Sequence, residues 1–132
     1  MSHPAATTAA VAAGSALGGC LRHATSQLFI TLGWHDFPWA TLCANILGSL
    51  LIGWFAAAVV SGRIQAGPIS NHFVVTGLLG GYTTYSIFSL ETLALLQAGA
   101  WMAGLANLAL TLFLCLLAVT LGYRLGNRGK PQ

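Results

Sequence analysis

The sequence predicts an all-α membrane protein with four transmembrane helices. Of its 132 residues, 56% are hydrophobic and 5% are charged, and the mean hydropathy is +0.77. A soluble domain carries about 25% charged residues, which cover the surface that faces water. The charged residues of this chain separate four apolar lengths, and a helix needs roughly 20 such residues to cross the hydrocarbon core of a bilayer. Lipid is therefore the expected solvent for most of the chain.

The four helices are expected to form one transmembrane domain that covers residues 1–132. Their predicted ranges are residues 5–32, 39–60, 71–97 and 99–125. The second and fourth ranges include long stretches without any charge, and the connections between the helices are short and contain Gly and Pro, which favour turns. This pattern predicts a small bundle with tight connections.

The first apolar run differs from a secretory signal peptide. No Lys or Arg precedes it, and its positive charge follows it, at Arg22. With four spans, both termini and the second connection lie on one side of the membrane. That side carries four of the five basic residues: Arg63, Arg124, Arg128 and Lys130. The positive-inside rule places these segments in the cytoplasm.

Composition also excludes several kinds of chemistry. The basic residues are scattered, so no stripe is available for a nucleic acid. The histidines are dispersed, and the cysteines fall in apolar runs without metal-ligand spacing, where they act as small apolar side chains: His3, His23, His35 and His72; Cys20, Cys43 and Cys115. A carboxylate pair would need both Asp36 and Glu91, and one of them lies in a predicted loop and the other at the end of an apolar run. We therefore expect a protein that is not an enzyme.

Small residues recur at i, i+4 on three of the predicted helices: Gly14 and Gly18, Ala44 and Gly48, Gly122 and Gly126. Apolar helices gain little from leaving lipid for one another, and small side chains let their backbones approach. These positions predict close helix contacts, within the chain or across a dimer.

Two helices carry polar residues at i, i+4, i+8, which places each set on one face. The sets are Thr41, Asn45 and Ser49 on the second helix, and Asn107, Thr111 and Cys115 on the fourth. A polar side chain at membrane depth needs a hydrogen-bond partner or a water-filled cavity. Two interpretations stay open: the polar residues join helices to one another, or they line a path across the membrane.

The third helix contains the segment GGYTTYSIFSLE at residues 80–91. Paired glycines and threonines disfavour a regular helix, so we expect a break near mid-membrane that frees carbonyl oxygens for a donor or a cation. Beyond it, Tyr85 and Phe88 lie at i, i+3, with Ser89 four residues after Tyr85. Aromatic edges beside hydroxyls can hold a small anion, and a cluster of packed rings is the alternative.

The segment 80–91 resembles the GG-x-TTFSTFS-x-E signature of the Fluc (CrcB) family of small bacterial fluoride channels. Residues 41–49 resemble that family's TL-x-VN-x-x-G segment, and residues 14–22 resemble its G-A-x-G-x-x-x-R opening. Together with the length and the number of spans, the resemblance covers nearly the whole chain.

The resemblance implies a passive, fluoride-selective channel that exports fluoride from the cytoplasm and lowers its toxicity. It implies a dual-topology, antiparallel homodimer with two pores in the bacterial inner (plasma) membrane. A structural Na⁺ ion that is not transported would be held by the backbone carbonyls of Gly80 and Thr83. The fluoride pathway would correspond to Asn45, Tyr85, Phe88, Ser89, Asn107 and Thr111, and the pore mouths to Arg22 and Glu91.

Two features depart from the family pattern. Tyr85 stands where the family signature has a phenylalanine, and the positive charge bias exceeds the near-zero bias expected of a chain that inserts both ways. Two alternative functions are a small multidrug-type proton-coupled antiporter and a non-transporting membrane assembly subunit. The antiporter needs a carboxylate within the bundle, and the first helix has none. The assembly subunit has no need of polar stripes or a broken helix.

Overall fold

The computed structural model describes residues 4–128, and every regular element in that range is helical. The elements are α1 (Pro4–Thr31), α2 (Trp39–Val60), α3 (Pro68–Asn71), η1 (His72–Leu79), α4 (Gly80–Tyr82), α5 (Tyr85–Gln97) and α6 (Trp101–Gly126). Four helical lengths are long and apolar enough to cross a membrane: Pro4–Thr31, Trp39–Val60, Pro68–Gln97 and Trp101–Gly126. The prediction of an all-α chain with four such helices is confirmed.

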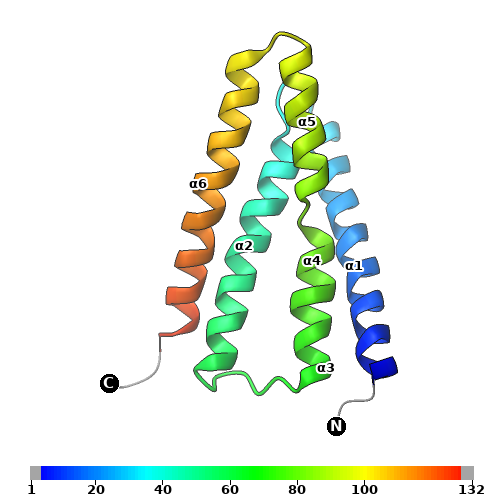
Figure 1. Ribbon diagram of the computed structural model, residues 1–132, viewed down its shortest axis with the longest axis vertical. Helices are drawn as coiled ribbons and strands as arrows, with labels where there is room; N and C mark the ends of the chain where they lie inside the picture. Colours follow the sequence, from blue (N-terminus) through cyan, green and yellow to red (C-terminus); the bar gives the residue numbers. More distant parts are fainter. Residues whose placement is uncertain (1–3, 129–132) are drawn as a thin grey trace.

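The helices form two long pairs that run side by side (Figure 1). The α2 helix packs along α6, and α1 packs along η1 and α4. The α5 helix then leans onto α6. The start of α1, the connection 61–67 and the end of α6 lie at one end of the bundle (Figure 1). This end carries Arg63, Arg124 and Arg128; Lys130 and His3 lie outside the described residues.

Glycines on α1 bring its backbone against the third span. A Cβ atom added to Gly14 would meet the carbonyl oxygen of Phe73, and one added to Gly18 would meet the carbonyl oxygen of Leu78 and the amide of Tyr82. These neighbours are backbone atoms, which cannot swing aside as a side chain does. Only glycine allows the two helices to lie this close.

The pair formed by α2 and α6 is built in the same way. Gly122 lies against the carbonyl oxygen of Leu50, and Gly126 lies against that of Trp54. On α2, Ala44 is fully buried. The close helix contacts predicted from the small residues are therefore confirmed, and these contacts lie within the chain.

The third span is not one regular α-helix. Its η1 segment has π-helical hydrogen bonding, in which each N–H donates to the carbonyl five residues back. The α4 turn ends at Tyr82, and α5 begins at Tyr85. Between them the backbone is extended, with φ −82° and ψ 158° at Thr83 and φ −152° and ψ 123° at Thr84. Two residues thus separate the halves of the span.

Glycines in the left-handed region end α1 and α5. At Gly33, with φ +77°, the amide donates to the carbonyl of Ile30 at 3.0 Å, and the Trp34 amide donates to that of Phe29 at 3.1 Å. This pair of bonds is a Schellman motif, which requires a residue that tolerates positive φ. Gly99 has φ +76° and ends α5 with the same pair of bonds. The tight connections expected from Gly and Pro follow from these ends.

The connection after α2 is tied to the end of α6 by a cation. Nη1 of Arg63 donates to the carbonyl oxygens of Leu125, Gly126 and Arg128, each at 3.2 Å. The last carbonyls of a helix lack helical donors and carry partial negative charge, so a guanidinium there is stabilising. Arg63 therefore links the connection after α2 to the end of α6, in addition to adding positive charge at this end of the bundle.

Candidate functional site

The side chain of Asn45 spans the gap from α2 to the interruption in the third span. Its Nδ2 donates to the backbone carbonyl of Thr84 at 3.0 Å, and its Oδ1 accepts from the Thr84 amide at 2.8 Å. Asn45 is 8% exposed. A carboxamide has a donor and an acceptor in one plane, as a peptide does, so it can satisfy both backbone groups of an extended residue. Asn45 thus compensates for helical hydrogen bonds that Thr84 does not make.

The interruption leaves the carbonyl groups of residues 80–83 without their regular helical donors. In a continuous helix the Thr84 amide would donate to the Gly80 carbonyl, and the Ile87 amide would donate to the Thr83 carbonyl. Instead, the Thr84 amide donates to Asn45, and the Ile87 amide donates to the Thr84 hydroxyl at 3.2 Å. The carbonyls of Gly80 and Thr83 are therefore among those that lose their helical donors. Hard, uncharged oxygens of this kind suit a Na⁺ ion.

A cavity of about 350 Å³ lies between α2, α5 and α6 and contains several of the residues selected from the sequence. Its lining includes Asn45, Ser49, Tyr85, Phe88 and Thr111. The Oγ1 atom of Thr111 is buried and has no hydrogen-bond partner among residues 4–128. The rings of Tyr85 and Phe88 have centroids 5.7 Å apart and are tilted by 51°. Neutral polar side chains and aromatic rings therefore line a space without a formal charge.

The two rings differ in how much of their surface the chain covers. Phe88 is 8% exposed, and Tyr85 is 80% exposed. A second cavity, of about 420 Å³, continues from Tyr85 along the interruption and is also lined by Thr83, Gly80 and Gly48. Asn45 and Tyr85 line both cavities. The polar face of α2 and the interruption of the third span thus border two neighbouring cavities.

Asn107 lies elsewhere, in a buried contact between α5 and α6. It is 1% exposed, and its Nδ2 donates to Oγ1 of Thr92 at 2.8 Å. That hydroxyl donates in turn to the carbonyl of Phe88 at 2.7 Å. Asn107 therefore supports the helical turn that carries Phe88 and does not line the cavity with Thr111. Ser89 is exposed and donates to the carbonyl of Tyr85 at 2.9 Å.

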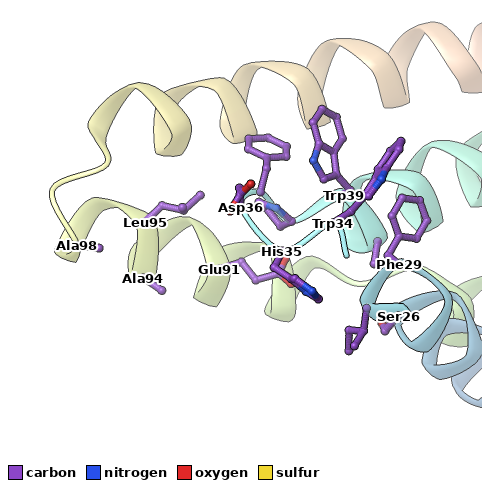
Figure 2. Close-up of a pocket in the computed structure, with 14 residues that line it drawn as sticks. Ser26, Phe29, Trp34, His35, Asp36, Trp39, Glu91, Ala94, Leu95 and Ala98 are labelled. Carbon is purple, nitrogen blue, oxygen red and sulfur yellow. The ribbon is translucent and has the colours of Figure 1, made fainter. Parts of the chain in front are cut away.

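Glu91 lies toward the end of the bundle opposite the termini. Its Oε1 accepts a hydrogen bond from the hydroxyl of Thr41 at 2.9 Å, and its Oε2 is buried without a partner among the described residues. Glu91 lines a third cavity, of about 460 Å³, formed by the 33–38 connection, α1 and α5 (Figure 2). Arg22 lies on α1, where its Nε is buried and has no partner in residues 4–128. The structure does not bring Arg22 and Glu91 into one cavity.

Some residues of this region could not be selected from the sequence. Thr84 is the partner of Asn45 and caps α5, and Thr92 is the partner of Asn107. Tyr82 and Thr25 join α4 to α1 through their hydroxyls at 3.2 Å. The only sequence signal for these roles is a hydroxyl group on an apolar helix. Such a hydroxyl needs a hydrogen-bond partner, but the sequence does not identify the partner.

Four apolar helices, with cavities between them that combine neutral polar and apolar side chains, are typical of a multi-pass membrane protein of the channel or transporter class. Comparison with known sequences specifies the class further. A family profile described as "CrcB-like protein, Camphor Resistance (CrcB)" matches residues 9–123. The chain belongs to this family, as its motifs indicate.

Curated relatives are similar over most of their length. The chain is 46% identical over 125 residues to "Fluoride-specific ion channel FluC 1" of Rhodopseudomonas palustris, with 94% of this chain and 89% of the relative covered. It is 47% identical over 118 residues to "Fluoride-specific ion channel FluC" of Paramagnetospirillum magneticum, with 89% and 92% covered. A protein of the same name from Opitutus terrae is 46% identical over 114 residues, with 86% of each chain covered.

Proposed function

We propose that this chain forms a fluoride-selective channel that lets fluoride leave the cytoplasm passively and so lowers its toxicity. The names of the relatives support this function, as does membership of the family. The structural observation that carries the proposal is the cavity lined by Asn45, Phe88 and Thr111, where neutral donors lie beside an aromatic ring between α2, α5 and α6. Neither alternative function has a specific observation in its favour.

The chemistry of the cavity suits a small, strongly hydrated anion. Such an ion enters a narrow site when several donors replace its water, and it leaves when none of them binds it too strongly. Asn45 uses one hydrogen of its Nδ2 for Thr84 and has a second, and the Thr111 hydroxyl carries one more. The edge of Phe88 adds a partial positive charge. A potential of 100 mV then supplies about 2.3 kcal/mol for each charge that crosses.

The other pathway residues have supporting roles in this proposal. Tyr85 replaces the family's phenylalanine and adds a hydroxyl beside the route. Ser89 and Asn107 hold the backbone turns that carry Tyr85 and Phe88. Arg22 and Glu91 act at the pore mouths.

We further propose that the working unit is an antiparallel, dual-topology homodimer in the bacterial inner membrane. Gly80 and Tyr85 are exposed on the single chain at a depth where lipid cannot satisfy freed carbonyls. A second copy covers them if it presents the same segment at the same depth. A two-fold axis in the membrane plane does this, because it inverts the partner.

The same symmetry supports the proposed structural Na⁺ ion. Gly80 and Thr83 of each subunit would supply carbonyl oxygens, because the amides that would otherwise bond them are diverted. The positive charge of the ion would balance the partial negative charge of these carbonyl oxygens at the place where the interrupted spans of the two subunits meet. It stabilises the dimer and is not transported.

Ion efflux from liposomes tests the channel. Liposomes containing the purified protein and loaded with either potassium fluoride or potassium chloride are given a potassium ionophore, and the anion that leaves is measured with a selective electrode. We expect rapid fluoride efflux and no chloride efflux above that of empty liposomes. Equal rates for the two anions would refute selectivity. Uptake of a cationic dye driven by a proton gradient, without fluoride efflux, would favour the antiporter.

Labelling of single cysteines tests the orientation. In a variant with Cys20, Cys43 and Cys115 replaced by Ala, one cysteine is added near the start of α1 or near the end of α6. An impermeant maleimide should label about half of each population from outside intact cells. Labelling from one side alone would contradict dual topology and with it the proposed sodium site.

A further inference from the structure

The cavity at the end opposite the termini has an aromatic wall. Four rings follow one another through edge and tilted contacts, with centroid distances of 5.6, 6.0 and 4.8 Å: Phe29 with Trp34, Trp34 with Trp39, and Trp39 with Phe37. All four line the cavity of about 460 Å³. Trp34 and Trp39 are 55% and 39% exposed, so their surfaces are accessible. Figure 2 shows them on the 33–38 connection and the start of α2.

The same cavity contains every acidic residue of the chain. The sequence has two, Asp36 and Glu91, and both line it. Asp36 is exposed on the connection, and Glu91 reaches in from α5 with a buried Oε2 that has no hydrogen-bond partner within residues 4–128. In Figure 2 the two residues enter from different elements. A carboxylate oxygen without a partner, beside an aromatic wall, is a combination that favours a cation.

We propose that this cavity binds an alkylammonium group, of the kind present in ethanolamine, choline and other organic amines. Aromatic faces attract such a cation because its charge is spread over weakly hydrated carbon and nitrogen. A metal ion would have to give up a firm water shell for rings that cannot replace it, and residues 4–128 contain no group of three or more His, Cys, Asp and Glu side chains that could hold one. A neutral ligand would leave the carboxylates of Asp36 and Glu91 without a counter-charge.

The site has a consequence for ion entry. Two negative charges near the end of a conduction path repel an approaching anion. A bound ammonium group would offset both while leaving the path itself free. The inference goes beyond the proposed function, because the binding of an amine to the cavity can be measured whether or not the chain conducts fluoride.

Tryptophan fluorescence provides a direct test. The chain has four tryptophans, and replacing Trp54 and Trp101 by Phe confines the signal to Trp34 and Trp39. This variant, purified in a nonionic detergent, is titrated with choline chloride and separately with 3,3-dimethyl-1-butanol, the uncharged isostere of choline. We expect a saturable change with choline and none with the alcohol. Sodium chloride at equal ionic strength controls for salt.

Charge variants complete the test. Asp36→Asn alters an exposed connection and should fold normally, and it should weaken choline binding about tenfold. Glu91→Gln should weaken it by at least as much, and Gln65→Glu, on the connection at the other end, should leave it unchanged. Equal changes with choline and with the alcohol would overturn the proposal, because they would indicate an apolar groove. No saturable change with choline, or unchanged binding in both charge variants, would overturn it as well.

The source of the ammonium group is then distinguished in vesicles. The reporter variant is placed in two kinds of vesicle with the same fraction of anionic lipid. The first contains phosphatidylglycerol and an uncharged glycolipid in equal parts, and the second contains phosphatidylglycerol and phosphatidylethanolamine in equal parts. If a lipid headgroup occupies the cavity, the second composition raises the choline concentration needed for half-saturation. If the half-saturating concentration is the same in both, the ligand is a soluble amine. Either result with saturable choline binding supports the site.

Discussion

Asn45 and Thr84 exchange two hydrogen bonds, at 2.8 and 3.0 Å, although they are 39 residues apart in sequence. Through these two hydrogen bonds, α2 holds the extended residues that interrupt the third span. The same side chain also lines the cavity with Phe88 and Thr111. The backbone geometry of the interruption and the proposed conduction path therefore depend on a single carboxamide, and its chemistry can be tested separately from its shape.

Asn45→Asp should disrupt the interruption. The substitution preserves size but replaces the Nδ2 donor with an oxygen that faces the Thr84 carbonyl and carries negative charge. Losing a buried hydrogen bond of this kind costs about 1–3 kcal/mol. We expect lower recovery of folded protein by size-exclusion chromatography and no fluoride efflux. Asn127→Asp, at an exposed site beyond α6, is the control; wild-type efflux from Asn45→Asp would show that the carboxamide is dispensable.

Phe88→Ile should abolish transport while the fold is kept. The side chain remains apolar and of comparable bulk, so the cost in stability is on the order of 1 kcal/mol, but the polarised ring edge is gone. Fluoride efflux per folded protein should fall by about tenfold or more, which corresponds to 1.4 kcal/mol. Phe113→Ile alters a ring that is 69% exposed on α6 and should conduct normally. If Phe88 only fills space, efflux scaled to folded protein will not change.

Gly18→Ala and Gly19→Ala should have opposite effects on stability. A Cβ atom at Gly18 meets backbone atoms of the third span, whereas one at Gly19 meets nothing within 4 Å. Overpacking against backbone costs about 1–3 kcal/mol, whereas Gly→Ala in an open helical position gains about 0.5–1 kcal/mol. Thermal unfolding in detergent, followed by circular dichroism, measures both. Similar melting temperatures for the two variants would contradict the close packing of α1 on the third span.

Removal of sodium should weaken the proposed dimer. When N-methylglucamine replaces Na⁺, an ion that binds only the assembled state no longer contributes its binding free energy, about 2.7 kcal/mol at a concentration of 100 times its dissociation constant. We expect more monomer by crosslinking and slower fluoride efflux, both restored when Na⁺ is returned. Thr83→Pro should lower dimer recovery irreversibly, because it removes the amide that donates to Leu79 and disfavours the helical turn before it. A dimer that is indifferent to Na⁺ would remove the ion from the proposal.

The four helices and the family could be predicted from the sequence, because each can be recognised from a continuous stretch of residues. Apolar length determines a span, and the motif at residues 80–91 is contiguous. The partners of polar side chains depend instead on how each helix is rotated against its neighbours, which periodicity does not specify. Asn107 and Thr111 share one face of α6, yet Asn107 is bonded to Thr92 while Thr111 lines a cavity without a partner. One residue of this stripe thus joins two helices, as the first interpretation expects, and its neighbour borders a cavity; the path across the membrane stays a prediction.

The π-helical η1 segment has a consequence for how the chain tolerates changes in length. A π-helical turn contains more residues than an α-helical turn over a similar rotation, so a segment of this kind holds surplus chain. Deleting Val75 should let η1 relax into an α-helix, with residues 80–91 keeping the face they present to α1 and α2. Deleting Ile87 leaves no surplus to absorb the loss and rotates everything that follows it in α5. Insertions and deletions between homologous sequences should therefore accumulate in η1 and be absent from α5.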